Sequence, residues 1–209
     1  MELIKYPKKL SVGDNIGIIS PSAPLAALVE HRYKNGVKKL EELGFNVVIG
    51  DHALDVTSYT AGTAQARAED IMKFFKDKEI KAIISFIGGY HSNQILKYLD
   101  FNVIRNNPKI IMGYSDMTVL LLAKYKKCGF PTFYGPSVLN QFADPFLPDY
   151  TLEFFNKAVM LDKPIGKIYP SEFWTCEFLD WFEKKDLERE RKFLQNSGWE
   201  WLKEGKAER

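Results

Sequence analysis

Apolar and polar positions follow one another along the chain in blocks of two kinds. In one kind apolar residues run together, as in a buried strand; in the other they recur every three or four positions, as on one face of a helix. Apolar runs predict strands at residues 15–20, 45–49, 80–87, 110–112 and 129–136. Helical spacing predicts helices at residues 27–43, 63–77, 92–99, 119–125 and 149–161. This alternation predicts an α/β protein with a doubly wound, mostly parallel sheet.

Four of the predicted strands run into loops of unusual composition. The loops are Pro21-Ser22, Gly88-Gly89, Tyr114-Ser115 and Gly135-Pro136. The carboxyl ends of parallel strands meet at one edge of a sheet, so the fold is expected to bring these four loops together. At Gly88-Gly89, the two glycines permit a positive φ or a close backbone approach to a ligand. A plain tight turn explains the same pair equally well.

The third of these loops places a serine between a strand and a helix. Gly113 ends the apolar run, and Ser115 follows it just before the helical pattern. A sharp turn there lifts the hydroxyl above the sheet and points the free N–H groups of the helix at whatever the serine attacks. Capping of the helix by Ser115 or Asp116 is the commoner use of such a turn and needs no chemistry. Met117 also stands where the Gly-x-Ser-x-Gly elbow has its second glycine.

The character of the chain changes in its last quarter. We expect a nucleophile-bearing α/β domain over residues 1–165, followed at 166–209 by a linker, an aromatic loop and the beginning of a second domain. The rings of residues 171–181 either fill a small core, the usual use of aromatic area, or present Trp174 as a stacking surface. The charge run at 183–192 predicts a solvated helix face or a flexible loop.

Composition narrows the possible ligands and the compartment. With 45% hydrophobic and 27% charged residues over 209 positions, the chain is globular. Its net charge of +2 gives no field that would favour nucleic acid or an anionic membrane. We expect no secretory signal, no membrane span and a cytoplasmic protein. Cys128 and Cys176 lie far apart and three scattered histidines add no ligand spacing, so reduced thiols and no metal are expected.

Three motifs in this order resemble one known family. They are the glycine pair Gly88-Gly89, the stretch Gly113-Tyr114-Ser115-Asp116-x-Thr118, and Gly135-Pro136. Together with the flanking I-G-G-Y-H-S-N-Q-I-L-K-Y-L-D and N-P-K-I-I-M-G-Y-S-D-M-T, they resemble the serine LD-carboxypeptidases, and most closely the branch of microcin C immunity peptidases. The likeness extends through P-S-E-F-W-T and G-W-E-W-L-K-E-G-K-A-E. It implies a flavodoxin-like or class I glutamine amidotransferase-like fold.

The resemblance implies a reaction and a set of site residues. The family cleaves amide bonds next to a free carboxylate with a serine, a histidine and a glutamate, acting on cell-wall peptides or on peptide-nucleotide antibiotics. By position, Ser115 resembles the nucleophile, and the backbone N–H groups of Gly89 and Asp116 would hold the oxyanion. Residues that would bind a small peptide or a peptidyl nucleotide are Tyr90, Ser92, Asn93 and Trp174, the last by stacking on a nucleobase.

The sequence departs from the family where the other catalytic residues are expected. The family's glutamate and histidine belong to a carboxy-terminal domain, which is only beginning at residues 205–209. His31, His52 and His91 do not match the family's base, and a serine without a base is a weak nucleophile. We therefore expect either a truncated, weak or inactive hydrolase, or a module that binds peptide or nucleotide carboxylates without cleaving them.

Two further expectations concern cofactors and assembly. An amidotransferase-like or nucleotide-binding protein would share the fold but would need a cysteine at the elbow or a phosphate loop. The chain has serine at that turn, and it has no Gly-Lys-Ser/Thr and no dinucleotide fingerprint, so we expect no cofactor. Without a partner domain, the aromatic tail from Phe173 to Trp201 is expected to be poorly buried, which predicts a homodimer or disorder there.

Overall fold

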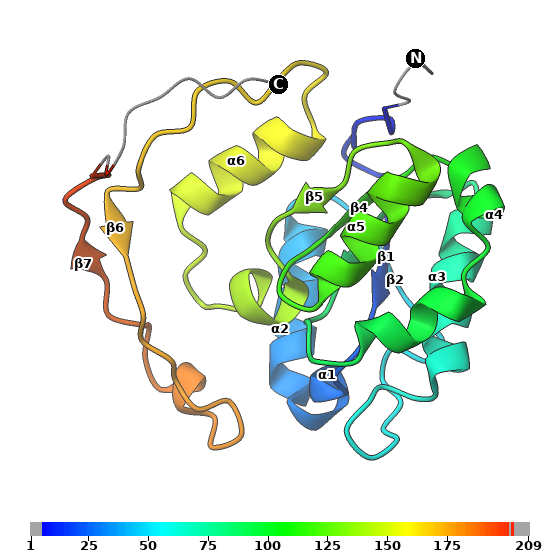
Figure 1. The fold of residues 1–209 in the computed structure, drawn as a ribbon. Coiled ribbons are helices and arrows are strands. Elements are labelled where there is room, and N and C mark those ends of the chain that lie inside the picture. Colours follow the sequence, from blue (N-terminus) through cyan, green and yellow to red (C-terminus); the bar gives the residue numbers. More distant parts are fainter. Residues whose placement is uncertain (1–5, 201, 203–209) are drawn as a thin grey trace.

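The computed structural model describes residues 6–200 and 202 and contains a five-stranded parallel sheet (Figure 1). The strands are β1 (Asn15–Ile19), β2 (Asn46–Ile49), β3 (Ile80–Ser85), β4 (Ile110–Gly113) and β5 (Phe133–Tyr134). Their order is β2-β1-β3-β4-β5, which is the order of flavodoxin-like sheets and confirms the predicted doubly wound fold. The order reverses between β1 and β3, so the loops after these two strands flank the crevice where such sheets bind ligands.

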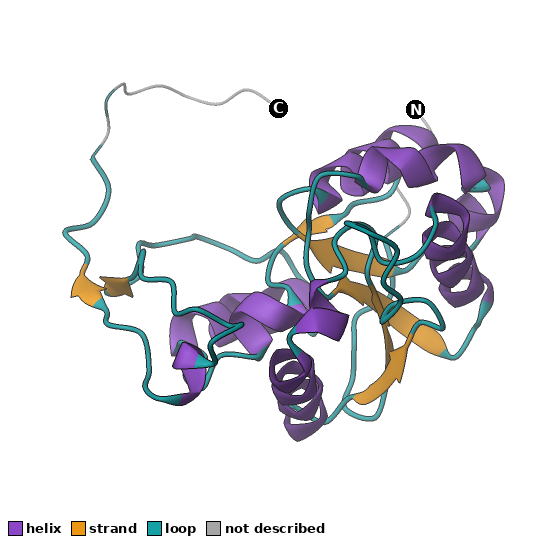
Figure 2. Ribbon diagram, turned by 90° about the horizontal axis from the view of Figure 1, so that it is seen from below, coloured by secondary structure: helices purple, strands orange, loops and turns teal. Residues whose placement is uncertain are grey.

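Helices cover both faces of the sheet (Figures 1 and 2). One face carries α1 (Leu25–Leu28), α2 (Glu30–Glu42), the π-helical turn η2 (Val138–Phe142) and α6 (Asp149–Val159). The other carries α3 (Ala64–Lys76), the 3-10 helix η1 (Ser92–Tyr98), α4 (Phe101–Asn106) and α5 (Met117–Cys128).

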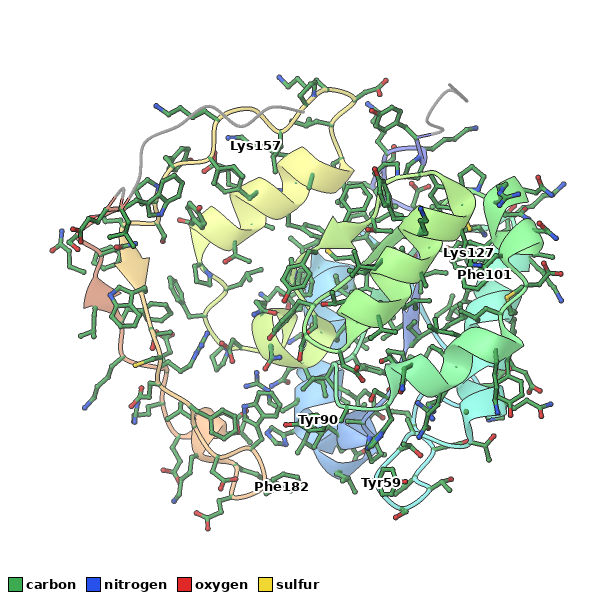
Figure 3. The ribbon with its side chains drawn as sticks, in the orientation of Figure 1. Tyr59, Tyr90, Phe101, Lys127, Lys157 and Phe182 are labelled. Carbon is green, nitrogen blue, oxygen red and sulfur yellow. The ribbon has the colours of Figure 1, made fainter. Side chains whose placement is uncertain are left out.

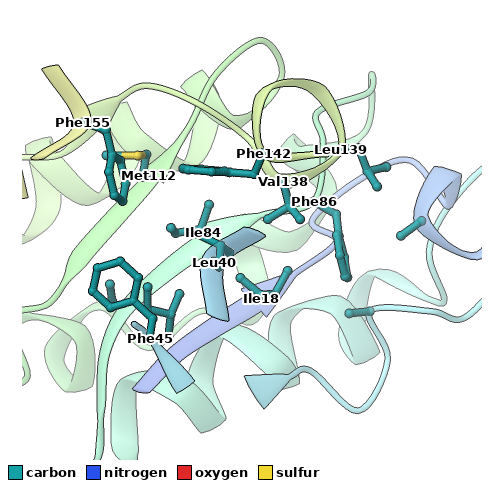
Figure 4. Close-up of a cluster of buried hydrophobic side chains, with 14 of the residues drawn as sticks. Ile18, Leu40, Phe45, Ile84, Phe86, Met112, Val138, Leu139, Phe142 and Phe155 are labelled. Atoms are coloured by element: carbon teal, nitrogen blue, oxygen red, sulfur yellow. The ribbon is translucent and has the colours of Figure 1, made fainter. Parts of the chain in front are cut away.

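The sheet is apolar on both sides because each face is covered. Successive residues of a strand point to opposite faces, so β3 sends Ile84 into one buried cluster and Ile83 into the other. Figure 4 shows the first cluster, in which Ile84 lies with Phe142 of η2 and Phe155 of α6. The two clusters fix the sheet between its helices and leave the carboxyl ends of the strands free to carry a site.

Most predicted elements are confirmed, and the differences have local causes. The helix expected at 27–43 is divided at Val29, whose φ of −125° interrupts it between α1 and α2. The stretch after Asp100, where no helix was predicted, forms α4 (Phe101–Asn106), because the Asp100 carboxylate accepts hydrogen bonds from the backbone N–H groups of Asn102 and Val103. The helix expected at 92–99 is a 3-10 helix.

The last part of the chain runs apart from the five-stranded sheet (Figures 1 and 2). A short antiparallel pair, β6 (Phe173–Trp174) with β7 (Leu194–Gln195), flanks the 3-10 turn η3 (Lys185–Leu187). Trp181 of this part is buried, whereas the rings of Phe173, Trp174, Phe178 and Phe182 are exposed. The expected homodimer and the division into domains stay predictions, and Trp201 and residues 203–209 lie outside the described residues. Within the described ranges, no helix is both long and apolar enough to cross a membrane.

Asp70 of α3 is a buried carboxyl beneath the loop that follows β2. The residue is 2% exposed, and its two carboxyl oxygens accept from the backbone N–H of His52 at 3.2 and 3.0 Å. Burial raises the pKa of Asp70 to about 6, whereas an aspartate in an unfolded chain has a pKa of about 3.9. At a pH between these two pKa values, the Asp70 carboxyl is protonated in the folded protein and ionised in the unfolded chain.

We expect this carboxyl to make the free energy of unfolding fall by about 3 kcal/mol as the pH rises from about 4 to 6. Asp70→Asn should remove that contribution, which urea unfolding at pH 4.5 and pH 8 would measure. Asp51→Asn is the control, because Asp51 is exposed and pairs with Lys73 at 2.7 Å. Equal pH dependence in the wild type and in Asp70→Asn would contradict the prediction.

Candidate active site

Ser115 sits in a strained turn between β4 and α5. Its φ is +59°, in the left-handed region that residues other than glycine and asparagine rarely adopt. The residue is exposed, and Gly113 before it has a φ of +157°. A Cβ on Gly113 would lie 2.4 Å from the Ser85 hydroxyl, so only glycine fits beneath the turn. The backbone thus presents the serine outward at the carboxyl end of β4.

The capping interpretation of this turn is wrong. Asp116 occupies the N-cap position of α5, but its side chain accepts no hydrogen bond from the first turn of the helix. The Ser115 side chain does not cap the helix either; its carbonyl accepts from the hydroxyl of Thr118 at 2.5 Å. The serine hydroxyl is therefore not used to begin α5.

The Asp116 carboxylate instead holds the glycine turn that follows β3. One of its oxygens accepts from the backbone N–H groups of His91 and Ser92 at 2.7 and 2.9 Å and from the Ser92 hydroxyl at 2.9 Å. Burial alone would raise the pKa of Asp116, but hydrogen bonds from Ser22, Ser92 and the backbone of His91 outweigh it and lower the pKa. An ionised carboxylate therefore fixes the turn after β3 against the turn after β4.

The glycine pair lies directly against the serine. A Cβ on Gly88 would be 3.0 Å from the Ser115 Cβ and 3.2 Å from its hydroxyl oxygen. Gly89 has a φ of +147°, and a Cβ there would lie 2.4 Å from the hydroxyl oxygen of Ser22. Gly89 therefore needs glycine for its close approach to Ser22, and Gly88 packs tightly against Ser115 and the backbone of Asp116.

Three backbone N–H groups of the turns after β3 and β4 are free within the part of the chain that the structure describes. Among the described residues, no group accepts a hydrogen bond from the N–H of Gly88, Gly89 or Asp116. The N–H of Ser115 itself is engaged, because it donates to the hydroxyl of Tyr134 at 3.3 Å. The predicted donors Gly89 and Asp116 are thus free to bind an anionic oxygen, and Gly88 is a further donor at the same place.

Two residues that hold this site were not singled out from the sequence. The hydroxyl of Ser22, fully buried after β1, accepts from the N–H groups of Tyr90 and His91 at 3.0 and 2.9 Å. Arg67 of α3 is also buried, and it donates to the Pro21 carbonyl at 2.6 Å. The position of Ser22 in a strand-end loop was a usable signal. Nothing in the helical pattern distinguished Arg67 from a surface arginine.

The predicted substrate-binding residues lie in different surroundings. Tyr90 is 89% exposed and Asn93 is also exposed, beside the glycine turn. Ser92 is fully buried, and its described contact is the hydrogen bond to Asp116. Trp174 is exposed on β6, which both ribbon views place apart from the sheet. Tyr90 and Asn93 thus lie on or just after the turn that follows β3, whereas Trp174 lies on β6, and the substrate-binding role of all four residues stays a prediction.

The histidines do not contact the serine hydroxyl. His31 lies 3.1 Å from Asp186 and His52 lies 2.8 Å from Asp55. The ring of His91 packs against the Tyr59 ring with their centroids 4.5 Å apart and their planes tilted by 47°, and Figure 3 shows Tyr59 and Tyr90 at the same edge of the molecule. Within residues 6–200 and 202, no side chain is hydrogen-bonded to the Ser115 hydroxyl, and no three His, Cys, Asp or Glu side chains gather to hold a metal ion.

A polar cavity opens next to the serine turn. It has a volume of about 130 Å³ and lies between the sheet and the last part of the chain. Tyr114 lines it from the serine turn, Asn140 from η2, and Trp181 from the last part of the chain. The charged side chains around it come from both parts: Arg32, Asp144, Glu177, Asp186, Arg189, Glu190 and Arg191.

Fold and site together define a class of protein. A serine at positive φ between a parallel strand and a helix is the local arrangement that α/β hydrolases use for a nucleophile. The family model of the LD-carboxypeptidase N-terminal domain matches residues 16–135, which include all of β2 to β5, β1 except its first residue, and the whole serine turn. The chain therefore belongs to the LD-carboxypeptidase family.

The chain is also similar to individual proteins in sequence and in structure. The chain is 37% identical to YocD of Bacillus subtilis over 204 residues, which are 97% of this chain and 60% of YocD. It is 40% identical to the microcin C7 self-immunity protein MccF of Escherichia coli over 192 residues, or 90% of this chain and 55% of MccF. A solved structure of MccF in complex with aspartyl sulfamoyl adenosine superposes with a TM-score of 0.83 at 38% identity, covering 91% of this chain and 57% of that one. The chain thus spans less than two thirds of the length of these relatives.

Proposed function

We propose that this chain carries the nucleophile of a serine-type carboxypeptidase that hydrolyses an amide bond. The observation that carries the proposal is the strained, exposed Ser115 packed against Gly88, in a turn where the N–H groups of Gly89 and Asp116 have no acceptor among the described residues. Backbone strain at a polar, exposed position is costly and is typical of functional sites. The family to which the chain belongs supports the same chemistry.

The geometry supports a two-step acyl transfer. The Ser115 hydroxyl oxygen attacks the amide carbonyl, and the N–H groups of Gly89 and Asp116 stabilise the oxyanion that forms. When this intermediate collapses, the C–N bond breaks, the amine leaves with a proton, and an acyl ester remains on Ser115. Water then hydrolyses the ester and releases the acid.

The general base is part of the proposal. None of the described side chains contacts the Ser115 hydroxyl, and a serine needs a base to become a strong nucleophile. The relatives extend well beyond the length that this chain matches. We propose that a histidine and a glutamate in that additional length complete the site, and that the chain by itself binds ligand and turns over slowly.

For the substrate we propose an aminoacyl or peptidyl nucleotide. MccF, at 40% identity, has been solved with aspartyl sulfamoyl adenosine, which joins an aminoacyl group to a nucleoside. The exposed rings of Tyr90 and Trp174 would suit a ligand that contains a nucleobase. An LD-peptide of a cell-wall fragment is the second candidate, because the family description names LD-carboxypeptidases.

A comparison of substrates tests the proposal. The protein would be incubated with an aspartyl adenylate analogue that contains a cleavable amide and with an LD-tetrapeptide, and the released amine would be followed by mass spectrometry. We expect cleavage of the nucleotide analogue. Cleavage of the tetrapeptide alone would assign the second candidate. Tight binding of both without any release, also after addition of the part of a relative that this chain does not match, would show a binding module and contradict a hydrolase.

Trp174 offers a separate test of nucleotide recognition. If its ring stacks on a nucleobase, Trp174→Ala should weaken the binding of adenosine monophosphate by roughly 1–3 kcal/mol, as calorimetry would measure. Phe173→Ala is the matched control, because Phe173 is an exposed ring that precedes Trp174 on β6 and therefore points to the opposite side of the strand. Unchanged affinity in Trp174→Ala would exclude this role.

A further inference from the structure

A fully buried arginine lies at the centre of the contact between α2 and the last part of the chain. Arg32 has no exposed surface. Its Nε and Nη2 donate to the Leu139 carbonyl at 3.0 and 2.6 Å, and Nη2 also reaches the Asn140 carbonyl at 3.1 Å. Nη2 donates to Asp144 at 2.7 Å, and Nη1 donates to Asp186 at 2.9 Å. The guanidinium of Arg32 thus joins η2 to Asp186, which lies 154 positions after Arg32 in the sequence.

Further groups complete a closed cluster around this arginine. His31 lies 3.1 Å from both oxygens of Asp186, and Arg191 forms an ion pair with Asp144. The Trp181 ring lies over the guanidinium of Arg32 at 4.5 Å. Removing one member of a buried charge cluster leaves its partner uncompensated, which costs several kcal/mol, so the cluster is either complete or broken. Residues 181–191, which we call the clasp segment, are therefore either seated on α2 or released from it.

The cluster continues to the serine turn through two side chains. The Asn140 amide donates to the Tyr114 hydroxyl at 2.5 Å, and Tyr114 directly precedes Ser115. The Tyr114 ring also packs edge-on against Tyr134, whose hydroxyl accepts from the Ser115 N–H. Because Arg32 binds the Asn140 carbonyl, it fixes the residue that in turn fixes Tyr114.

We propose that Arg32 is a positioning residue that couples the seating of the clasp segment to the conformation of the serine turn. When the clasp segment is seated, Arg32 holds Asn140, Asn140 holds the Tyr114 hydroxyl, and the cavity beside Ser115 has its outer wall. When the segment is released, Tyr114 loses its fixed partner and the turn that presents Ser115 loosens. The role deepens the proposed function, on which it rests, because it concerns the same nucleophile.

Hydrogen exchange tests the coupling without needing turnover. Asp186→Asn should speed exchange in the clasp segment and also in residues 112–118, although Asp186 does not touch that stretch. Glu188→Gln is the matched control, because Glu188 is an exposed carboxylate in the same segment that pairs with Lys185. Faster exchange in the clasp segment alone would overturn the proposal, because it would show an attachment without coupling.

Reactivity of Ser115 toward a serine-directed fluorophosphonate gives the second readout. We expect Asp186→Asn and Asn140→Ala each to slow labelling by about 2- to 30-fold, and the double variant to be no slower than the slower single variant. Effects that multiply in the double variant would overturn the coupling. Should Asp186→Asn fail to fold, Trp181→Phe tests the same contact more mildly. If the wild type is not labelled, the proposed function fails, and hydrogen exchange alone decides the coupling.

Discussion

Replacing Ser115 by alanine is expected to abolish covalent labelling of the protein by a fluorophosphonate and, when the part of a relative that carries the proposed base is added, to lower amide hydrolysis by at least about 10³-fold. The loss is large because the hydroxyl forms the bond to the acyl group and no other group can replace it. Binding of adenosine monophosphate should change little, since the alanine removes one oxygen and leaves the backbone donors of Gly89 and Asp116 in place. Intact-protein mass spectrometry and calorimetry would measure the two effects.

Ser58 provides a matched control for Ser115. It is also an exposed serine at positive φ, +57°, but it lies in the loop after β2 and does not face the glycine turn. Backbone strain and exposure are therefore shared, and only the surroundings differ. Ser58→Ala should leave labelling unchanged. Equal labelling of wild type and Ser115→Ala would remove Ser115 from the nucleophile role.

Asp116→Ala is expected to lower the free energy of unfolding by about 3 kcal/mol and to slow the labelling of Ser115 as well. The substitution removes a carboxylate that accepts from two backbone N–H groups and from the hydroxyl of Ser92. These donors would be left without their acceptor, and the glycine turn would no longer be held against the serine. Urea unfolding at pH 7 measures the first effect and fluorophosphonate kinetics the second.

The pH dependence of the Asp116 contribution has a definite sign. Because the folded state lowers the pKa of this carboxyl, its stabilisation is complete above the unfolded pKa of about 3.9 and is lost as the pH falls through the folded pKa. Asp116→Asn should therefore lose less stability than the wild type on acidification below about pH 4.

Asp100→Ala is the control for the effect on reactivity. Asp100 also accepts two backbone N–H groups, at the start of α4, so its loss should cost about 1 kcal/mol of stability. It has no contact with the glycine turn, and labelling of Ser115 should stay unchanged. If both variants slow labelling equally, general destabilisation explains the effect and the specific role of Asp116 is contradicted.

Local sequence signals were sufficient for the elements that local chemistry determines. The five strands follow from their apolar runs. Gly129, whose φ of +75° suits a glycine, was a readable signal for the end of α5, although the helix was predicted to end at residue 125. The capping carboxylate of Asp100 was likewise a readable signal for α4, although no helix was predicted there. These features depend on residues within a few positions of one another, which is why periodicity and capping rules find them.

What the sequence by itself determined is the parallel sheet, the loops at its carboxyl edge and the serine among them. Only the tertiary structure decided that Ser115 adopts a positive φ, that the Asp116 carboxylate turns away from its own helix toward the turn after β3, and that Arg32 joins η2 to the clasp segment. The partners of Asp116 and Arg32 lie 24 to 154 residues away in the chain. Side-chain direction at such positions is set by which distant donors and charges the fold places nearby, and this cannot be read from local residue preferences.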